Sequence, residues 1–152
     1  VRYRHPGGVY SFPIPDGWFV LRGRRNRVVD DKFDTVIHPD GREMMIVLRA
    51  SVSAPQGEST LRTYEADKWS EANRIDQARR ERLILAGMPA FRVTYRSPDT
   101  PESISRVAFV HERQLLVINC VHATMQDGGL PMAIKQSLSQ LRLDVVDHAS
   151  VP

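Results

Sequence analysis

The run from Leu115 to Val121 is the sequence feature that most constrains the fold. It reads Leu-Leu-Val-Ile-Asn-Cys-Val, so both faces of an extended strand at this place would be largely apolar. A membrane-spanning helix needs roughly 18 apolar residues, and this run is far shorter. The run therefore predicts a central strand in a sheet that other parts of the chain cover on both sides.

Two more strands are predicted just before this run, at residues 85–96 and 103–111. Phe91, Val93 and Tyr95 alternate with polar residues, which is the period-2 pattern of a strand. Turn residues at 98–102 and at Glu112-Arg113 separate the segments, so the three strands are expected to be consecutive and antiparallel. Gly87, in the turn that opens this region, is predicted to have a positive φ.

The remaining apolar patterns supply further strands and two helices. Strands are predicted at residues 9–14, 18–21, 33–38, 43–52 and 79–85. The Pro-Asp-Gly sequences at 15–17 and 39–41 predict hairpins that join the first two and the next two of these strands. Helices are predicted over about 59–73, with Trp69 as the buried anchor, and over about 131–141. The pattern predicts a mostly antiparallel α+β fold in which the helices cover the sheet.

The bulk composition bounds the class of protein. The chain has 152 residues, of which 41% are hydrophobic and 26% charged, as in an ordinary globular domain. We expect one domain over residues 1–152, with a core at about 9–143 and flexible ends at 1–8 and 147–152. A cytoplasmic location would follow if the chain is full length, and an exported or lipid-anchored one if a signal segment was removed.

Two short motifs resemble those of a known family. Residues 12–18 read Phe-Pro-Ile-Pro-Asp-Gly-Trp and resemble the "P-x-G-W" opening of the PsbP-like and Mog1-like superfamily. Residues 85–91 read Leu-Ala-Gly-Met-Pro-Ala-Phe and resemble its "l-x-G-x-P-A" turn before a strand. The resemblance covers roughly residues 9–143. It implies an α/β/α sandwich around an antiparallel sheet.

The resemblance also implies binding rather than catalysis. Members of the superfamily include photosystem extrinsic subunits, a nuclear GTPase-binding factor and many bacterial exported proteins. We therefore expect a non-catalytic binding or accessory protein that engages a protein partner. One alternative is an adaptor or chaperone for secreted effectors, like the type VI branch, which holds apolar segments and often forms homodimers. Another is a domain that binds a small molecule or an anionic ligand.

No residue pattern indicates catalysis, a cofactor or a metal. The single cysteine, Cys120, excludes an intrachain disulfide, and its apolar neighbours favour a buried thiol over a reactive one. Asp30, Asp31 and Asp34 are interpreted as a solvated charged loop. The serines at 137 and 139 fall in a predicted helix rather than at a nucleophile elbow. The five histidines lack ligand spacing: His5, His38, His111, His122 and His148.

Two arginine groups are the candidate site residues, predicted to carry any contact with a partner or anion. They are Arg24, Arg25 and Arg27, and Arg79, Arg80 and Arg82. Guanidinium groups bind carboxylates and phosphates in a defined bidentate geometry. Both groups would form one patch only if their strand ends meet. Nucleic acid is not an expected partner, because the net charge is only +3 and aromatic residues are not interleaved with the arginines.

Overall fold

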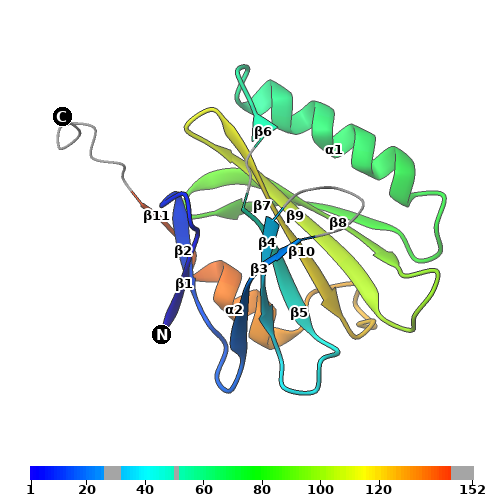
Figure 1. Cartoon of the computed structure of the whole chain (residues 1–152). Helices are drawn as coiled ribbons and strands as arrows, with labels where there is room; N and C mark the ends of the chain where they lie inside the picture. Colours follow the sequence, from blue (N-terminus) through cyan, green and yellow to red (C-terminus); the bar gives the residue numbers. More distant parts are fainter. Residues whose placement is uncertain (26–31, 50–51, 145–152) are drawn as a thin grey trace.

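The computed structural model describes residues 1–25, 32–49 and 52–144. Its helices are α1 (Glu58–Ala72) and α2 (Met132–Ser139) (Figure 1). The strands are β1 (Arg2–Arg4), β2 (Tyr10–Pro13), β3 (Phe19–Arg25), β4 (Lys32–Ile37), β5 (Met44–Leu48), β6 (Val52–Ser53), β7 (Arg79–Leu85), β8 (Met88–Arg96), β9 (Ser103–His111), β10 (Gln114–His122) and β11 (Arg142–Leu143).

The strands form one large and one small antiparallel sheet. The large sheet has the order β3-β4-β5-β10-β9-β8-β7, with β6 also paired to β10, and the small sheet has the order β1-β2-β11. The run that was apolar on both faces is thus an interior strand, between β5 and β9. Two helices on a mostly antiparallel sheet confirm the predicted α+β class.

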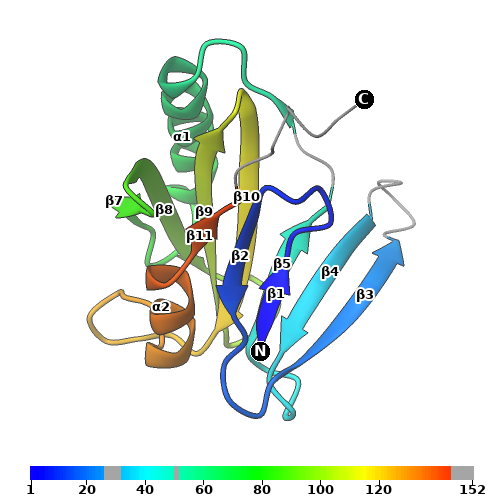
Figure 2. The ribbon, with the colours of Figure 1, turned by 90° about the vertical axis from the view of Figure 1, so that its left-hand side faces the viewer.

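Both faces of β10 are covered, as the sequence required. Leu115 and Val117 pack in a cluster with Leu61 of α1. Ile118 packs on the opposite face, in a cluster with Ile134 of α2 and with side chains of the small sheet. Figure 2 shows α2 with β1, β2 and β11 on one side of the large sheet and α1 on the other. The result is the predicted α/β/α sandwich, with the small sheet sharing the layer of α2.

The predicted hairpins have different outcomes. The hairpin around residues 39–41 is confirmed, because β4 and β5 pair in antiparallel register with Ile37 opposite Met44. The hairpin around residues 15–17 is wrong, because β2 pairs with β1 and β11 while β3 pairs with β4. Residues 10–12 are all buried. The Pro-Asp-Gly turn therefore carries the chain from the small sheet to the large one.

The amino-terminal segment is not the flexible end that the sequence predicted. Residues 2–4 form β1, and Tyr3 at its centre is 0% exposed. The hydroxyl group of Tyr3 donates a hydrogen bond to Asp34 Oδ2 at 2.8 Å. Pairing of β1 with β2 and the hydrogen bonds from Arg2 to the carbonyl oxygens of Ser11 and Gln140 also hold this segment, although its charged residues made it read as polar. The other predicted flexible end, 147–152, lies outside the described residues.

Helix α1 covers the sheet with a slightly different stripe from the predicted one. Leu61, Glu65 and Ala72 are its buried residues, whereas Trp69 is half-buried. At 3.6 residues per turn, Trp69 points about 80° away from Leu61 around the helix axis. Its position at the rim corrects its predicted role as the buried anchor. Its ring lies instead under the Arg80 guanidinium carbon, 5.2 Å from the ring centroid.

The turn between β7 and β8 supports a prediction about Gly87. Its φ is +80°, as the sequence predicted, and Ala86 before it has a φ of +51°. Gly87→Val should lower the free energy of unfolding by about 1–2 kcal/mol, because a branched side chain strains left-handed backbone. A Cβ there meets nothing within 4 Å, so the loss is not a clash. In urea titrations Gly87→Asn should lose less, and equal losses would contradict the strain argument.

The hydroxyl group of Tyr10 supports a prediction of the opposite sign. Tyr10 is 0% exposed, and within the described part of the chain its hydroxyl group has no hydrogen-bond partner. Tyr10→Phe should therefore raise the free energy of unfolding by about 1 kcal/mol, since an unpaired buried hydroxyl group is costly. Tyr3→Phe is the control and should lower it, because that hydroxyl group is bonded to Asp34. A loss of stability in Tyr10→Phe would contradict the prediction.

Candidate binding site around strand β7

Strand β7 is one edge of the large sheet, and its side chains alternate between the two faces. In the register of β7 and β8, Arg82 lies opposite Phe91, which belongs to the apolar cluster under α1. Arg79 pairs with Thr94 and shares the opposite face with Glu81. The edge strand therefore presents arginine to both faces of the sheet.

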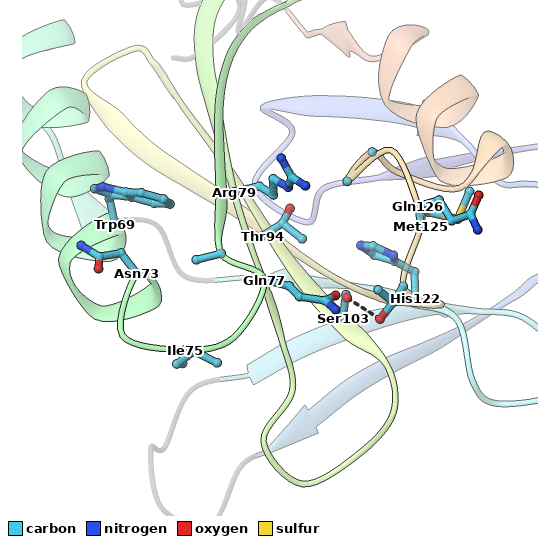
Figure 3. A pocket seen from close by; sticks show the side chains of 14 residues that line it. Trp69, Asn73, Ile75, Gln77, Arg79, Thr94, Ser103, His122, Met125 and Gln126 are labelled. Atoms are coloured by element: carbon cyan, nitrogen blue, oxygen red, sulfur yellow. Dashed lines mark hydrogen bonds between the residues drawn. The ribbon is translucent and has the colours of Figure 1, made fainter.

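A hollow of about 760 Å³ lies beside the start of β7. Its walls come from the end of α1, from the connection to β7, from the ends of β8, β9 and β10, and from residues 124–129 (Figure 3). We call it the loop pocket. Residues along its wall include Trp69, Gln77, Arg79, His122, Met125 and Gly128. Its volume is within the range of small-molecule sites, about 300–1,000 Å³.

Buried polar side chains form a network beside the loop pocket, on one face of β8, β9 and β10. Arg92 is the first of them, with a side chain only 8% exposed. It donates hydrogen bonds to Thr94 Oγ1 at 2.5 Å, to the Gly128 carbonyl oxygen at 2.8 Å and to Glu81 Oε2 at 2.7 Å. Thr94 Oγ1 lies 2.7 Å from Ser105 Oγ, which lies 2.7 Å from His122 Nε2.

The hydrogen bonds of His122 fix its tautomer. Its Nδ1 lies 2.7 Å from the carbonyl oxygen of Ala123, which can only accept, so Nδ1 donates. In the neutral ring Nε2 then accepts from the hydroxyl group of Ser105. Burial lowers the pKa of His122, which favours this neutral form. Both ring nitrogens are occupied by structural partners.

The same bonds anchor the loop that closes the pocket. Arg92 holds the Gly128 carbonyl oxygen, and Ser103 Oγ lies 2.8 Å from Thr124 Oγ1. Gly128 has a φ of +71°, and a Cβ at this position would lie 3.0 Å from Arg79 Nε. The Arg79 side chain therefore lies against the backbone of the loop, and a side chain at position 128 would require it to shift.

The structure separates the two predicted arginine groups. Arg79 lines the loop pocket, while Arg80 lies over Trp69. Arg82 pairs with Glu65 at 3.2 Å, beside a smaller apolar groove of about 250 Å³ between α1 and the β7–β8 hairpin. Arg24 and Arg25 belong to β3, which is the edge strand at the opposite side of the large sheet from β7. Arg27 lies outside the described residues.

The aspartates of residues 30–34 and the single cysteine were also weighed as candidate site residues. Asp34 is not part of a solvated loop as predicted, because it is 0% exposed in β4. Asp30 and Asp31 lie outside the described residues. Cys120 is buried, as the sequence favoured, and burial raises the pKa of its thiol to about 12. A thiol with so high a pKa is a poor nucleophile at neutral pH.

Sequence reasoning missed the contact between Ser105 and His122, which lie on adjacent strands. The two-residue turn at Glu112-Arg113 places Ser105 opposite Cys120 in the β9–β10 pair. His122 is then the diagonal neighbour of Ser105 on the same face. The predicted turn at residues 112–113 implies this register. The sequence alone did not show that the side chains of Ser105 and His122 both face the interior.

The buried histidines predict a pH-dependent stability. Burial lowers the pKa of both His5 and His122 below 6.5, so the unfolded chain takes up protons before the folded chain does. Their stabilising contribution is complete above the unfolded pKa of about 6.5 and is lost as the pH falls below it. Urea midpoints should therefore fall between pH 7 and pH 5.

The controls for this pH dependence are single histidine variants. His5→Asn and His122→Asn should each show a smaller fall in the urea midpoint between pH 7 and pH 5 than the unchanged chain. His38→Asn should keep the full fall, since that side chain is 40% exposed in its turn. A fall of equal size in all variants would contradict the assignment to the buried rings.

The part of the chain that the structure describes was searched for metal sites and for membrane-spanning helices. There, no group of three or more His, Cys, Asp or Glu side chains is placed to hold a metal ion. None of the helices among these residues has the length and apolar character needed to cross a membrane.

The fold was compared with known families, sequences and solved structures. No protein-family model matches the chain, and no curated protein sequence matches it. The solution structure of cyanobacterial PsbP (CyanoP) from Synechocystis sp. PCC 6803 matches with a TM-score of 0.58 and 13% sequence identity. The match covers 94% of this chain and 91% of that one. At this identity the likeness concerns the fold alone, and it agrees with the motif resemblance. The chain therefore has a PsbP-like fold.

Proposed function

We propose that this chain is a non-catalytic accessory protein that binds a protein partner along strand β7. The non-catalytic part rests on the loop pocket. His122 is the one group on its wall with an ordinary pKa near neutrality, and both of its ring nitrogens are engaged. Ser105, its hydroxyl partner, is 0% exposed. General acid–base chemistry needs a titratable group within reach of the substrate, and this arrangement does not offer one.

The open edge of β7 carries the partner-binding part of the proposal. The sheet ends at β7, so the outward N–H and C=O groups of this strand have no strand partner in the described sheet. Ile84 is 67% exposed on this edge strand. Such an edge can accept an added strand from another protein, and neighbouring arginines favour acidic residues in that strand. We therefore infer an extended, acidic segment as the partner element.

A chaperone or adaptor for secreted effectors is a narrower version of this proposal. Its support is the apolar groove beside β7, which is lined in part by Leu61, Ile84 and Phe91. A groove of about 250 Å³ holds only a few side chains, which favours a short apolar stretch within the partner segment over a long helix. Pairing of two copies through β7 is the alternative assembly, and gel filtration would detect it as a homodimer.

Affinity capture with matched surface variants tests the partner proposal. Ile84→Asp should remove a partner that the unchanged chain captures from a lysate of source cells. Val52→Asp is the control, because Val52 is 61% exposed on β6 and does not line the groove. Retention of the partner by Ile84→Asp, or its loss in both variants, would contradict binding at β7.

A substrate screen tests the non-catalytic proposal separately. Ester, amide, phosphoester and glycoside substrates should show no turnover above the uncatalysed rate. A turnover that disappears in Ser105→Ala or His122→Asn would overturn the proposal, because it would show that the buried pair takes part in chemistry.

A further inference from the structure

We infer that the loop pocket binds a small organic oxyanion, with its carboxylate or phosphate group at Arg79 and its apolar part against Trp69. This site differs from the β7 groove proposed for the protein partner. Neither inference depends on the other.

The charge of the pocket is the first argument. Arg79 carries the only permanent charge among the lining side chains. Within the described residues it has no carboxylate at ion-pair distance, whereas its neighbours Arg82 and Arg92 pair with Glu65 and Glu81. An exposed guanidinium group without an internal partner is suited to bind an oxyanion through two parallel hydrogen bonds.

Two acidic side chains near this loop, Asp127 and Glu81, are already engaged. Asp127 is not part of the pocket wall, and its Oδ1 accepts a hydrogen bond from the Gly129 backbone N–H at 2.8 Å. Glu81 is bonded to Arg92 at 2.7 Å. The neutral form of His122 adds no positive charge, so Arg79 is the group that selects the sign of the ligand.

The apolar part of the wall is the second argument. Trp69 is half-buried at the end of α1, and Ile75 follows it on the connection to β7. Met125, 36% exposed, contributes from the loop after β10. Figure 3 shows these side chains around the hollow, with Arg79 between Trp69 and His122 in that view. Apolar walls with few polar groups are typical of small-molecule sites.

The rigidity of the site is the third argument. The network anchors the loop, because Arg92 donates a hydrogen bond to the Gly128 carbonyl oxygen and His122 Nδ1 donates one to the carbonyl oxygen of Ala123. Gln77 on the pocket wall has a φ of +59°, an uncommon conformation for a residue with a side chain. Backbone strain of this kind is concentrated at functional sites. The pocket is thus pre-shaped, which lowers the entropic cost of binding.

Nuclear magnetic resonance titration with four probes of similar size tests this inference. Benzoate and phenyl phosphate carry the anion, benzyl alcohol is neutral and benzylamine is cationic. The anions should shift the backbone amide signals of Gln77, Gly128 and Gly129 and the indole N–H signal of Trp69. The anions should bind at least about tenfold more tightly than the other two probes. The neutral and cationic probes cannot form the charge-assisted hydrogen bond to Arg79, and the loss of one such bond lowers affinity by about this factor.

Charge-matched variants complete the test. Arg79→Gln should weaken benzoate or phenyl phosphate binding by about tenfold or more. Arg113→Gln removes the same charge from the distant β9–β10 turn and should leave the affinity unchanged. Trp69→Leu should weaken both anions, because it reduces the apolar wall.

Three results would overturn the inference. They are equal binding of anionic and neutral probes, unchanged affinity in Arg79→Gln, and the absence of shifts at the pocket residues. A preference for one of the two anions would instead identify the ligand as a carboxylate or a phosphate. Ile84→Asp should lose the protein partner without any change in the binding of the four probes. The tests therefore distinguish failure of the partner proposal from failure of the ligand inference.

Discussion

Asp34→Ala should lower the free energy of unfolding by about 3–5 kcal/mol, the loss typical of removing one member of a buried charged group. The Asp34 side chain is completely buried. Its carboxylate accepts hydrogen bonds at 2.8 Å from the Tyr3 hydroxyl group and at 2.8 Å from the Gly23 backbone N–H. Arg49 Nε lies 3.6 Å away and Arg22 Nη1 lies 3.9 Å away.

The size of this loss follows from the groups left behind. Alanine leaves the Tyr3 hydroxyl group and the Gly23 N–H without their acceptor, and it leaves two arginines without their counter-charge. Gly23 lies in the irregularity of β3 between Leu21 and Arg24. The carboxylate thus ties β1 and this part of β3 to β4.

Urea titration measures the effect, and Asp67→Ala is the matched control. Asp67 is exposed on α1, so its substitution should change the free energy of unfolding by no more than about 0.5 kcal/mol. Asp34→Asn keeps one acceptor oxygen and should fall between the two. A loss below about 1 kcal/mol in Asp34→Ala would show that solvent or a shifted side chain replaces the carboxylate.

The large sheet was predictable because its signals are local and long. The strands β8, β9 and β10 each have nine residues, enough for the period-2 pattern to appear. Short stretches of turn residues separate these strands, so consecutive strands are expected to pair in antiparallel orientation. Gly87 was predictable for the same reason, since a two-residue hairpin turn requires positive φ.

The small sheet was not predictable from periodicity. Strand β1 has three residues and β11 has two, which is too few for any pattern to be recognised. The Pro-Asp-Gly turn at 15–17 indicates that the chain reverses, but not which strand each arm pairs with. Burial of Tyr3 and Tyr10 decides that pairing, and burial depends on contacts far along the sequence.

The candidate site was only partly predictable for a similar reason. Arginine composition singled out Arg79, but the wall of the loop pocket comes from segments between Trp69 and Gly129 that only the fold brings together. To predict the buried polar network, one must know both the register of β8, β9 and β10 and which of their side chains face the interior. Asp34 was read with the acidic residues beside it in the sequence, although the β4–β5 pairing places it in the interior.

Phe109→Ala should also lower the free energy of unfolding by about 3–5 kcal/mol, because it leaves a cavity in a fully packed core. Phe109 is 0% exposed in β9. Its ring meets the ring of Tyr10 edge to face, with centroids 5.4 Å apart and an interplanar angle of 71°. Tyr10 belongs to β2, the middle strand of the small sheet. This aromatic pair therefore joins the two sheets.

The location of the damage should distinguish this variant from a general loss of stability. Val110→Ala, the adjacent half-buried residue on the opposite face of β9, should cost only about 1 kcal/mol. In Phe109→Ala, hydrogen exchange should rise more in β1 and β2 than in the β7–β8 hairpin, because the small sheet loses its contact with the large one. A uniform rise in all strands would mean that the two sheets unfold only together, and that the aromatic pair stabilises the whole fold rather than their junction.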